Sequence, residues 1–306
     1  MAYPVAPGMP QYSGTFIPEI WSGKIIKNYY DATILSQISN TDYEGEIKNK
    51  GDKVIIRTTP RITTRRYNKG QNLQIERPES DNVELLIDYG RYWNTILDDV
   101  DKVQADIKQM DLWSMEAAEQ MKIDVDTDVL ADVYADVHAD NAGTTAGKRS
   151  GNINLGGTGS PLALTKSNII DKIVECGQVL DEQSAPETGR YLIIPAWART
   201  LVMTSDLKNA SVTGDGQSTL RNGRLGEIDR FTLYSSNLLS TTVDGGTTVT
   251  NMIFGHKSAL AYAAQLTNVE TLRAESTFGT LMRGLMVCGW KVTKPEGIGH
   301  LYAYKG

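Results

Sequence analysis

The residues best suited to chemistry form one acidic run, Asp124-Val125-Asp126-Thr127-Asp128. Alternating carboxylates open the calcium-binding loop of an EF-hand, which also needs a glycine for its sharp turn and a bidentate glutamate at its end. Here Val129 stands at the glycine position and Ala135 at the glutamate position. Both residues also fit a helical pattern, so the sequence argues against a calcium site.

Other short motifs that could bind a cofactor or carry a nucleophile are incomplete. Gly156-Gly157-Thr158-Gly159 lacks the GxGxxG spacing of a dinucleotide site and does not join a strand to a helix. Ser205-Asp206-Leu207-Lys208 matches SxxK, but no accompanying KTG motif is present. The chain also contains neither a P-loop nor a GxSxG nucleophile elbow. These patterns predict no cofactor and no catalytic residue.

The three histidines and two cysteines are equally isolated. His138, His256 and His300 fall in separate elements without spaced partners, so we expect surface or hydrogen-bonded histidines rather than metal ligands. Cys176 and Cys288 lie far apart in apolar surroundings, which favours buried thiols in a reducing compartment over a disulfide framework. We therefore expect no metal site and no enzyme activity.

Composition predicts a soluble protein with a substantial core. A chain of 306 residues suffices for one large domain or two or three smaller ones. Its formal net charge of −6 disfavours a general nucleic-acid binder. No apolar run approaches the roughly 20 residues of a membrane span, and the first residues do not form a signal peptide. We expect synthesis in a cytoplasm and no membrane contact.

A long helix is predicted over residues 98–140, which contain no Gly and no Pro. Its apolar residues recur at spacings of three and four, which marks one face of an α-helix. They include Val100, Val103, Ile107, Met110, Ala117, Met121, Val125, Val129, Val133 and Val137. Acidic residues stand four apart on the opposite face, at Asp124, Asp128, Asp132, Asp136 and Asp140. Because like charges at this spacing destabilise a helix, this face is either simply solvated or offset by a cationic partner.

A β-hairpin with a long loop precedes this helix. Alternating residues predict a strand over 52–59, stopped by Pro60, and a returning strand over 83–87. The connection between them has few large apolar residues and an excess of basic ones, at Arg61, Arg65, Arg66, Lys69 and Arg77. A long two-stranded projection is not stable alone, so we expect it to lie on another surface, for which the acidic stripe is suited.

An N-terminal arm is predicted over residues 1–44. Prolines break its first part, and Phe16, Ile17 and Trp21 give it an apolar stretch. An apolar arm on an otherwise polar chain indicates docking, either on the protein's own body or on a neighbouring molecule.

The rest of the chain mixes helices and strands. Periodicity predicts helices over 165–181 and 196–204, a buried strand over 190–195 and a strand over 231–235. Asp244-Gly245-Gly246 is a turn signal, and residues 284–293 and 301–304 are predicted closing strands. Strands, then helices, then strands again indicate an α+β fold rather than a βαβ series.

Several local runs, in this order along the chain, resemble the major capsid protein of tailed bacteriophages. They are Ile17-Pro18-Glu19-Ile20-Trp21, Lys50-Gly51-Asp52-Lys53-Val54, Gly189-Arg190-Tyr191-Leu192-Ile193-Ile194-Pro195, Leu220-Arg221-Asn222-Gly223, Phe254-Gly255-His256-Lys257-Ser258-Ala259 and Gly289-Trp290-Lys291-Val292. The likeness is to the HK97-like fold, in its P22-coat-like branch. One departure is Arg230, which stands where many relatives have a glycine before the strand at Phe231.

This resemblance implies the HK97-like capsid fold with an N-terminal arm, an extended β-hairpin (the E-loop), a P-domain with a long spine helix, and an A-domain. The division it implies is an arm over 1–44, the E-loop over 45–97, the P-domain over 98–160, the A-domain over 161–251 and a return to the P-domain over 252–306. It implies no catalytic centre, and no isopeptide crosslinking is expected at Lys69.

By the same resemblance, copies of the chain assemble into pentamers and hexamers of an icosahedral head that encloses double-stranded DNA. The implied partners are a portal, a separate scaffolding protein and DNA held non-specifically. The implied location is the virion, after assembly in the host cytoplasm. An encapsulin-like compartment shell and a soluble α+β enzyme with an unrecognised site are the alternatives.

We expect the contacts between copies to involve the basic hairpin, the acidic stripe and the apolar arm. The candidate residues are Arg61, Arg65, Arg66, Lys69, Arg77, Asp124, Asp128, Asp132, Asp136, Phe16, Ile17 and Trp21.

Overall fold

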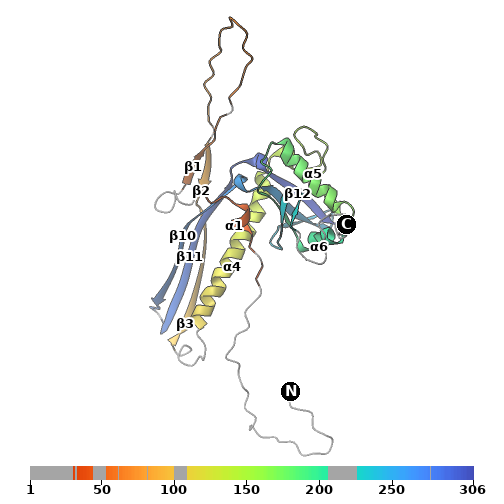
Figure 1. Ribbon diagram of the computed structural model, residues 1–306. Helices are drawn as coiled ribbons and strands as arrows, with labels where there is room; N and C mark the ends of the chain where they lie inside the picture. Colours follow the sequence, from red (N-terminus) through yellow and green to blue (C-terminus); the bar gives the residue numbers. More distant parts are fainter. Residues whose placement is uncertain are drawn as a thin grey trace, which may run out of the picture.

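The structure is a computed structural model, and it describes residues 30–31, 33–43, 53–60, 62–80, 82–99, 109–205, 226–275 and 277–306. Most of the predicted arm, with Phe16, Ile17 and Trp21, lies outside these residues, as does Arg61. The run at Leu220-Arg221-Asn222-Gly223 lies outside them as well. Figure 1 shows a narrow helix-and-sheet region, a more rounded lobe beside it, and a hairpin loop that projects away from both.

The described elements follow a mixed α+β order, as predicted. The strands are β1 (Lys53–Arg57), β2 (Asn82–Leu86), β3 (Tyr89–Asp98), β4 (Leu162–Leu164), β5 (Arg190–Ile194), β6 (Glu227–Ile228), β7 (Phe231–Ser235), β8 (Thr241–Asp244), β9 (Thr247–His256), β10 (Leu260–Arg273), β11 (Gly279–Val292) and β12 (Ile298–Lys305). The helices are α1 (Leu35–Ile38), α4 (Gln109–Asp132), α5 (Ile169–Glu182) and α6 (Ala196–Thr204). Short 3-10 turns are η1 (Val133–Asp136), η2 (Ala139–Asn141), η4 (Lys257–Ala259) and η5 (Pro295–Gly297).

The narrow region is a three-stranded sheet with α4 running beside it (Figure 1). Its strand order is β10-β11-β3, and both pairings are antiparallel. Along β3, side chains that are more and less exposed alternate, because successive residues of a strand point to opposite faces. Arg91 lies on the face that meets α4, and Tyr92 lies on the open face. The sheet therefore presents a row of β3 and β11 side chains to the helix.

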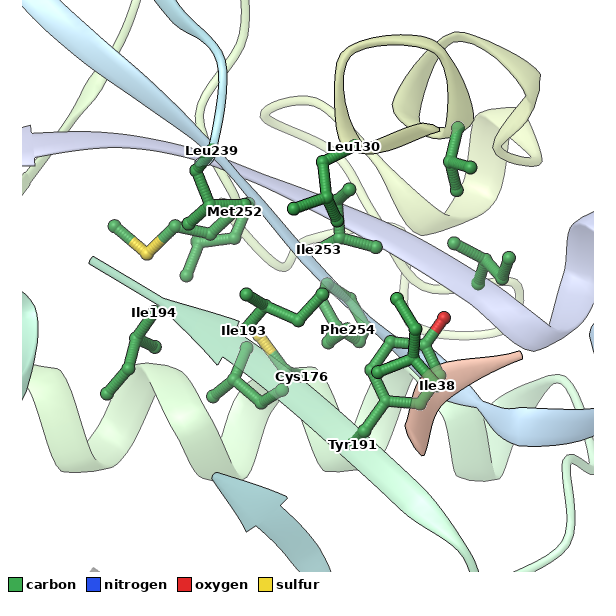
Figure 2. Packing of buried hydrophobic residues seen from close by; sticks show 14 of the residues in the cluster. Ile38, Leu130, Cys176, Tyr191, Ile193, Ile194, Leu239, Met252, Ile253 and Phe254 are labelled. Atoms are coloured by element: carbon green, nitrogen blue, oxygen red, sulfur yellow. The ribbon is translucent and has the colours of Figure 1, made fainter. Parts of the chain in front are cut away.

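The rounded lobe is built on a second sheet with the order β4-β12-β9-β5-β7-β6, to which β8 adds beside β9. All five residues of β5 are buried, which confirms the strand predicted over 190–195. The predictions of α5, α6, β7 and the turn at Gly245 are confirmed too. Figure 2 shows Ile193 and Ile194 of β5 beside Met252, Ile253 and Phe254 of β9 in the core of this lobe.

Leu130 of α4 and Ile38 of α1 belong to the same core (Figure 2). The end of the long helix is thus fixed against the lobe, while its earlier part runs along the three-stranded sheet. Burying an aliphatic side chain of this size contributes roughly 1.5–3 kcal/mol, so both contacts tie the two regions together.

The predicted start and end of the long helix are wrong. Asp98 is the last residue of β3 and pairs with Gly279 of β11, so it does not begin a helix. At the other end α4 stops at Asp132, and residues 133–141 form the turns η1 and η2. The Asn141 side chain donates to the carbonyls of Glu296 (2.9 Å) and Ile298 (2.8 Å). These long-range bonds hold the chain out of the helical path that its apolar spacing favours.

The hairpin strands are confirmed. β1 and β2 pair antiparallel, with Lys53 opposite Leu86 and Arg57 opposite Asn82. Their base rests on the start of β10, where Leu85 and Ile87 pack with Ala261 and Ala263. The connecting loop projects beyond this base without pairing into strands (Figure 1).

The strands of the two sheets do not divide at residue 251, where the predicted A-domain ends. That residue lies inside β9, which pairs with both β5 and β12. Residues Ile298–Lys305 therefore belong to the sheet of the rounded lobe, while β10 and β11 belong to the narrow region.

Candidate functional site

The projecting loop, residues 62–80, is exposed at every position. It carries large apolar side chains in open solvent, with Leu73 78% and Ile75 93% exposed and Ile62 and Tyr67 also exposed. Exposed apolar residues gathered on one segment mark a contact surface. A loop of this length without secondary structure is commonly functional.

Few internal bonds hold this loop. Thr63 Oγ1 donates a hydrogen bond to Glu76 Oε1 (3.3 Å). The backbone N–H of Asn68 donates to Gln71 Oε1 across the turn at Gly70, whose φ is 86°. Such a left-handed position suits glycine. Within the described chain the cations Arg65, Arg66, Lys69 and Arg77 form no ion pair. The loop therefore offers both charge and apolar surface to another molecule.

The acidic stripe of α4 faces the three-stranded sheet. Arg91 of β3 donates to Asp128 Oδ2 through Nη2 (2.7 Å), and its Nη1 lies 3.6 Å from Asp124 Oδ2. The Tyr89 hydroxyl donates to the same Asp128 carboxylate. One arginine thus offsets two of the five carboxylates of the predicted stripe within the chain.

The Asp128 carboxylate is stabilised in its charged form. Partial burial alone raises the pKa of Asp128, but the hydrogen bonds from Arg91 and Tyr89 outweigh burial, so this pKa lies below its ordinary value. Its hydrogen bond to Asp128 likewise raises the pKa of Arg91. The contact between Arg91 and Asp128 therefore favours the charged form of both side chains.

Of the remaining three, Asp132 and Asp136 face β11, and Asp140 lies in the turn η2. Asp132 Oδ2 accepts a hydrogen bond from the indole nitrogen Nε1 of Trp290 (2.9 Å). Asp136 Oδ2 lies 2.6 Å from Lys291 Nζ. Asp136 therefore has a cationic partner, whereas Asp132 has only a neutral one in the described chain. Asp124, Asp128 and Asp132 lie on α4 and Asp136 lies in η1, and the four carboxylates have different electrostatic settings.

Asp126 is a buried carboxylate whose structural role the sequence reasoning missed. It is buried and accepts hydrogen bonds from the backbone N–H groups of Ile34 (2.6 Å) and Leu35 (3.2 Å). Burial raises the pKa of Asp126, and these two bonds oppose the rise. The signal was present, since Asp126 falls out of the four-residue spacing and beside the buried Val125 and Val129. It anchors Ile34 and Leu35, in the last part of the predicted arm.

The isolated histidines and cysteines have structural surroundings. His300 shares a hydrogen bond with Asn251 Oδ1 through Nε2 (3.0 Å) and stacks on Tyr134. Cys176 and Cys288 are buried free thiols, and burial raises the pKa of both. Among the described residues no three His, Cys, Asp or Glu side chains gather as metal ligands. None of the described helices is long and apolar enough to span a membrane.

The comparisons with known proteins agree on one group. A family model described as phage capsid protein matches residues 88–301. A chain from a structure of Mycobacterium phage Che8 is 26% identical with a TM-score of 0.75, and the match covers 93% of this chain and 96% of that chain. A chain from the capsid structure of cyanophage P-SCSP1u is 17% identical with a TM-score of 0.73, covering 95% of this chain and 94% of that chain. A search of the curated proteins gave no match.

Proposed function

The chain belongs to the phage capsid protein family, and on that premise we propose that it is the major capsid protein of a tailed-phage head. Copies assemble into pentamers and hexamers that close into an icosahedral shell around double-stranded DNA. The role is structural rather than enzymatic. The observation that carries this proposal is the projecting loop, which holds exposed apolar and basic side chains away from its own body (Figure 1).

The contacts that we propose between copies are those of the loop, the acidic row and the arm. The residues proposed are Arg61, Arg65, Arg66, Lys69 and Arg77 of the predicted hairpin connection, Asp124, Asp128, Asp132 and Asp136 of the predicted acidic stripe, and Phe16, Ile17 and Trp21 of the predicted arm. An exposed ion pair contributes only about 0–1 kcal/mol, but a closed shell repeats each contact many times. Modest single contacts also let wrongly placed copies dissociate before the shell closes.

Further partners follow from the same role. We propose that the shell forms in the host cytoplasm and becomes part of the virion, with a portal and a separate scaffolding protein. The formal net charge of −6 suits a lumen that holds DNA only non-specifically, since tight binding of DNA depends on neutralising its phosphates with basic side chains. The arm, E-loop, P-domain and A-domain division is part of the proposal, with β12 assigned to the sheet of the A-domain.

The test is expression followed by negative-stain microscopy and sedimentation. Purified wild-type protein should form closed shells, and R65E/R66E should reduce particle number at least tenfold. Far-ultraviolet circular dichroism should show that the variant still folds, because both side chains are exposed. A wild-type protein that stays monomeric at high concentration would contradict the proposal. Shells filled with protein cargo instead of DNA, when isolated from infected cells, would contradict the phage role.

A further inference from the structure

Residues 30–31 and 33–38, which we call the arm root, are attached to α4 at two separate points. Near one end of the root, the Tyr30 hydroxyl donates a hydrogen bond to Glu116 Oε2. Near the other end, two backbone N–H groups donate to Asp126 Oδ2. Ten residues of an α-helix span about 15 Å, so the two attachment points are well separated along the helix axis.

The order of these contacts fixes the direction in which the chain leaves the body. After α1, Asn40 pairs with the start of β10 through two backbone hydrogen bonds (2.7 and 2.9 Å). Followed backwards from Asn40, the chain passes Asp126 and then Glu116, so it runs beside α4 toward the start of that helix (Figure 1). The residues before Tyr30 therefore begin beside the first half of α4, at a distance from the rounded lobe.

The Asp126 carboxylate has no cation to offset its burial. It is 4% exposed, and in the described chain no lysine or arginine forms an ion pair with it. Its neighbours Val125 and Val129 are buried as well, so an apolar side chain would suit the surroundings. Because an unpaired buried charge is strongly destabilising, the two N–H groups are what explains a carboxylate at this position.

Apolar packing and hydrogen bonding act differently on the arm root. Ile34, Leu35 and Ile38 are buried in the same core as Leu130 of α4. Burial of this kind is favourable but non-directional, so it does not select one rotation or one register along the helix. Two N–H groups that converge on one carboxylate oxygen select both. Asp126 thus determines where along α4 the root lies.

We infer that Asp126 is a positioning residue for assembly, which together with Glu116 sets the point where residues 1–29 of the arm leave the body. The inference rests on the proposed function, in which the arm contacts another copy. An arm that starts from a different point meets a different surface of that copy. A subunit with a displaced root can therefore keep its fold and still assemble badly.

Substitution of Asp126 in the full-length protein tests the inference. D126L keeps the branched shape of the side chain and removes the acceptor, whereas D126N keeps an acceptor oxygen without the charge. In unassembled D126L, hydrogen exchange at the N–H groups of Ile34 and Leu35 should be at least tenfold faster, as measured by mass spectrometry. Closed shells of D126L, counted by negative-stain microscopy, should be at least tenfold fewer. D126N should stay within threefold of the wild type in both measurements, because an acceptor oxygen still positions the root.

T127L is the matched control, since it places a leucine at the next position of α4, which is exposed. It should equal the wild type in exchange rate and in shell number. Fast exchange together with a wild-type number of shells from D126L overturns the inference, and so does slow exchange in D126L. Loss of shells from D126N while exchange stays slow also overturns it, because the root would then be in place. A wild type that forms no shells would instead contradict the proposed function.

Y30F supplies a second variant that leaves the core intact, because Tyr30 is 37% exposed. It removes the hydroxyl that binds Glu116 and should reduce the number of shells at least threefold, with the wild-type urea midpoint of unfolding. If D126L fails to fold, this variant decides the question. A wild-type number of shells from Y30F overturns the inference.

Discussion

At the scale of single residues, Arg230 shows a local conformation at odds with its residue type. Its φ is 65°, and the preceding Asp229 has a φ of 46°, so both lie in the left-handed region that favours glycine. The Arg230 guanidinium lies 2.8 Å from Asp181 Oδ2 and 3.5 Å from Glu187 Oε1. Asp181 also pairs with the buried Arg190 at 2.7 Å. The arginine thus accepts backbone strain and gains ion pairs that a glycine would lack.

We predict that R230G unfolds at nearly the wild-type free energy, whereas R230A is less stable than R230G by about 1 kcal/mol. Both variants lose the ion pairs, which at this exposed position are worth about 0–1 kcal/mol, but only glycine relieves the left-handed backbone. Urea unfolding of the unassembled protein measures the difference. An alanine variant more stable than the glycine variant would contradict this account.

A second residue-scale prediction concerns acid stability. Burial lowers the pKa of His300 to about 4, below the ordinary value of 6.5, because the buried ring resists protonation. The neutral ring therefore contributes stability that is fully present above pH 6.5 and is lost as the pH falls toward 4. The wild type should lose on the order of 3 kcal/mol more than H300Q between pH 7 and pH 4.

The matched measurement is urea unfolding of both proteins across that range. H300Q keeps a side chain that can donate to Asn251. The difference in unfolding free energy between the two proteins therefore reports lost packing at pH 7 and protonation of His300 at pH 4. Equal losses for the two proteins would show that His300 does not set the acid limit.

Sequence reasoning predicted the positions of the acidic residues better than the cations and N–H groups that these residues contact. Four-residue spacing correctly places Asp128 on α4, but Asp136 lies in η1, beyond the end of the helix. Their cations, Arg91 and Lys291, are 37 and 155 positions away in the sequence, so no local pattern indicates them. Asp126 was missed for a similar reason, since the N–H groups that it binds lie 92 and 91 positions earlier.

At the scale of elements, the packing of the hairpin base against the sheet depends on one glycine of β11. A Cβ on Gly289 would lie 1.9 Å from the carbonyl oxygen of Leu86 in β2, a distance that no real contact allows. A Cβ on Gly90 of β3 would lie 3.9 Å from its nearest neighbour, the carbonyl oxygen of Met286. Close approach of β2 to the sheet therefore requires glycine at one position and tolerates a side chain at the other.

We predict that G289A displaces the hairpin and that G90A leaves it in place. In G289A, protease should cut the hairpin at least tenfold faster than in the wild type. Shells should be rare, because displacement of β1 and β2 also displaces the loop that joins them. G90A should match the wild type in both measurements. Equal cleavage rates for G289A and the wild type would mean that the hairpin base rests on β11 less closely than described.

The elements that periodicity predicted well are those stabilised by nearby residues. β5, α5 and α6 were predicted within a few residues because each buries a continuous or amphipathic apolar stretch. β3 was missed, and its last residue was assigned to the helix. β3 is a strand because it pairs with β11, whose residues follow it by nearly two hundred positions, and tertiary pairing of this kind overrides local spacing.

At the scale of the whole molecule, the body has a large buried core and the loop, residues 62–80, buries no side chain. The core joins α1, α4, α5 and the seven-stranded sheet, and it contains most of the buried apolar residues (Figure 2). The loop has hardly any internal bonds and exposes Leu73 and Ile75 almost fully. The composition of the loop, with few large apolar residues and an excess of basic ones, predicted this contrast.

Non-covalent contacts hold the copies together in the proposed shell. They are ion pairs and apolar contacts, which denaturant abolishes, and Lys69 has no identified partner for an isopeptide bond. Assembled shells boiled in detergent should therefore give one band at the monomer mass of 33.7 kDa on a gel. Shells incubated for days should give the same band, because no slow covalent step follows closure. A ladder of multimers that survives reducing agent would instead require a covalent link, and K69R would then show whether that lysine forms it.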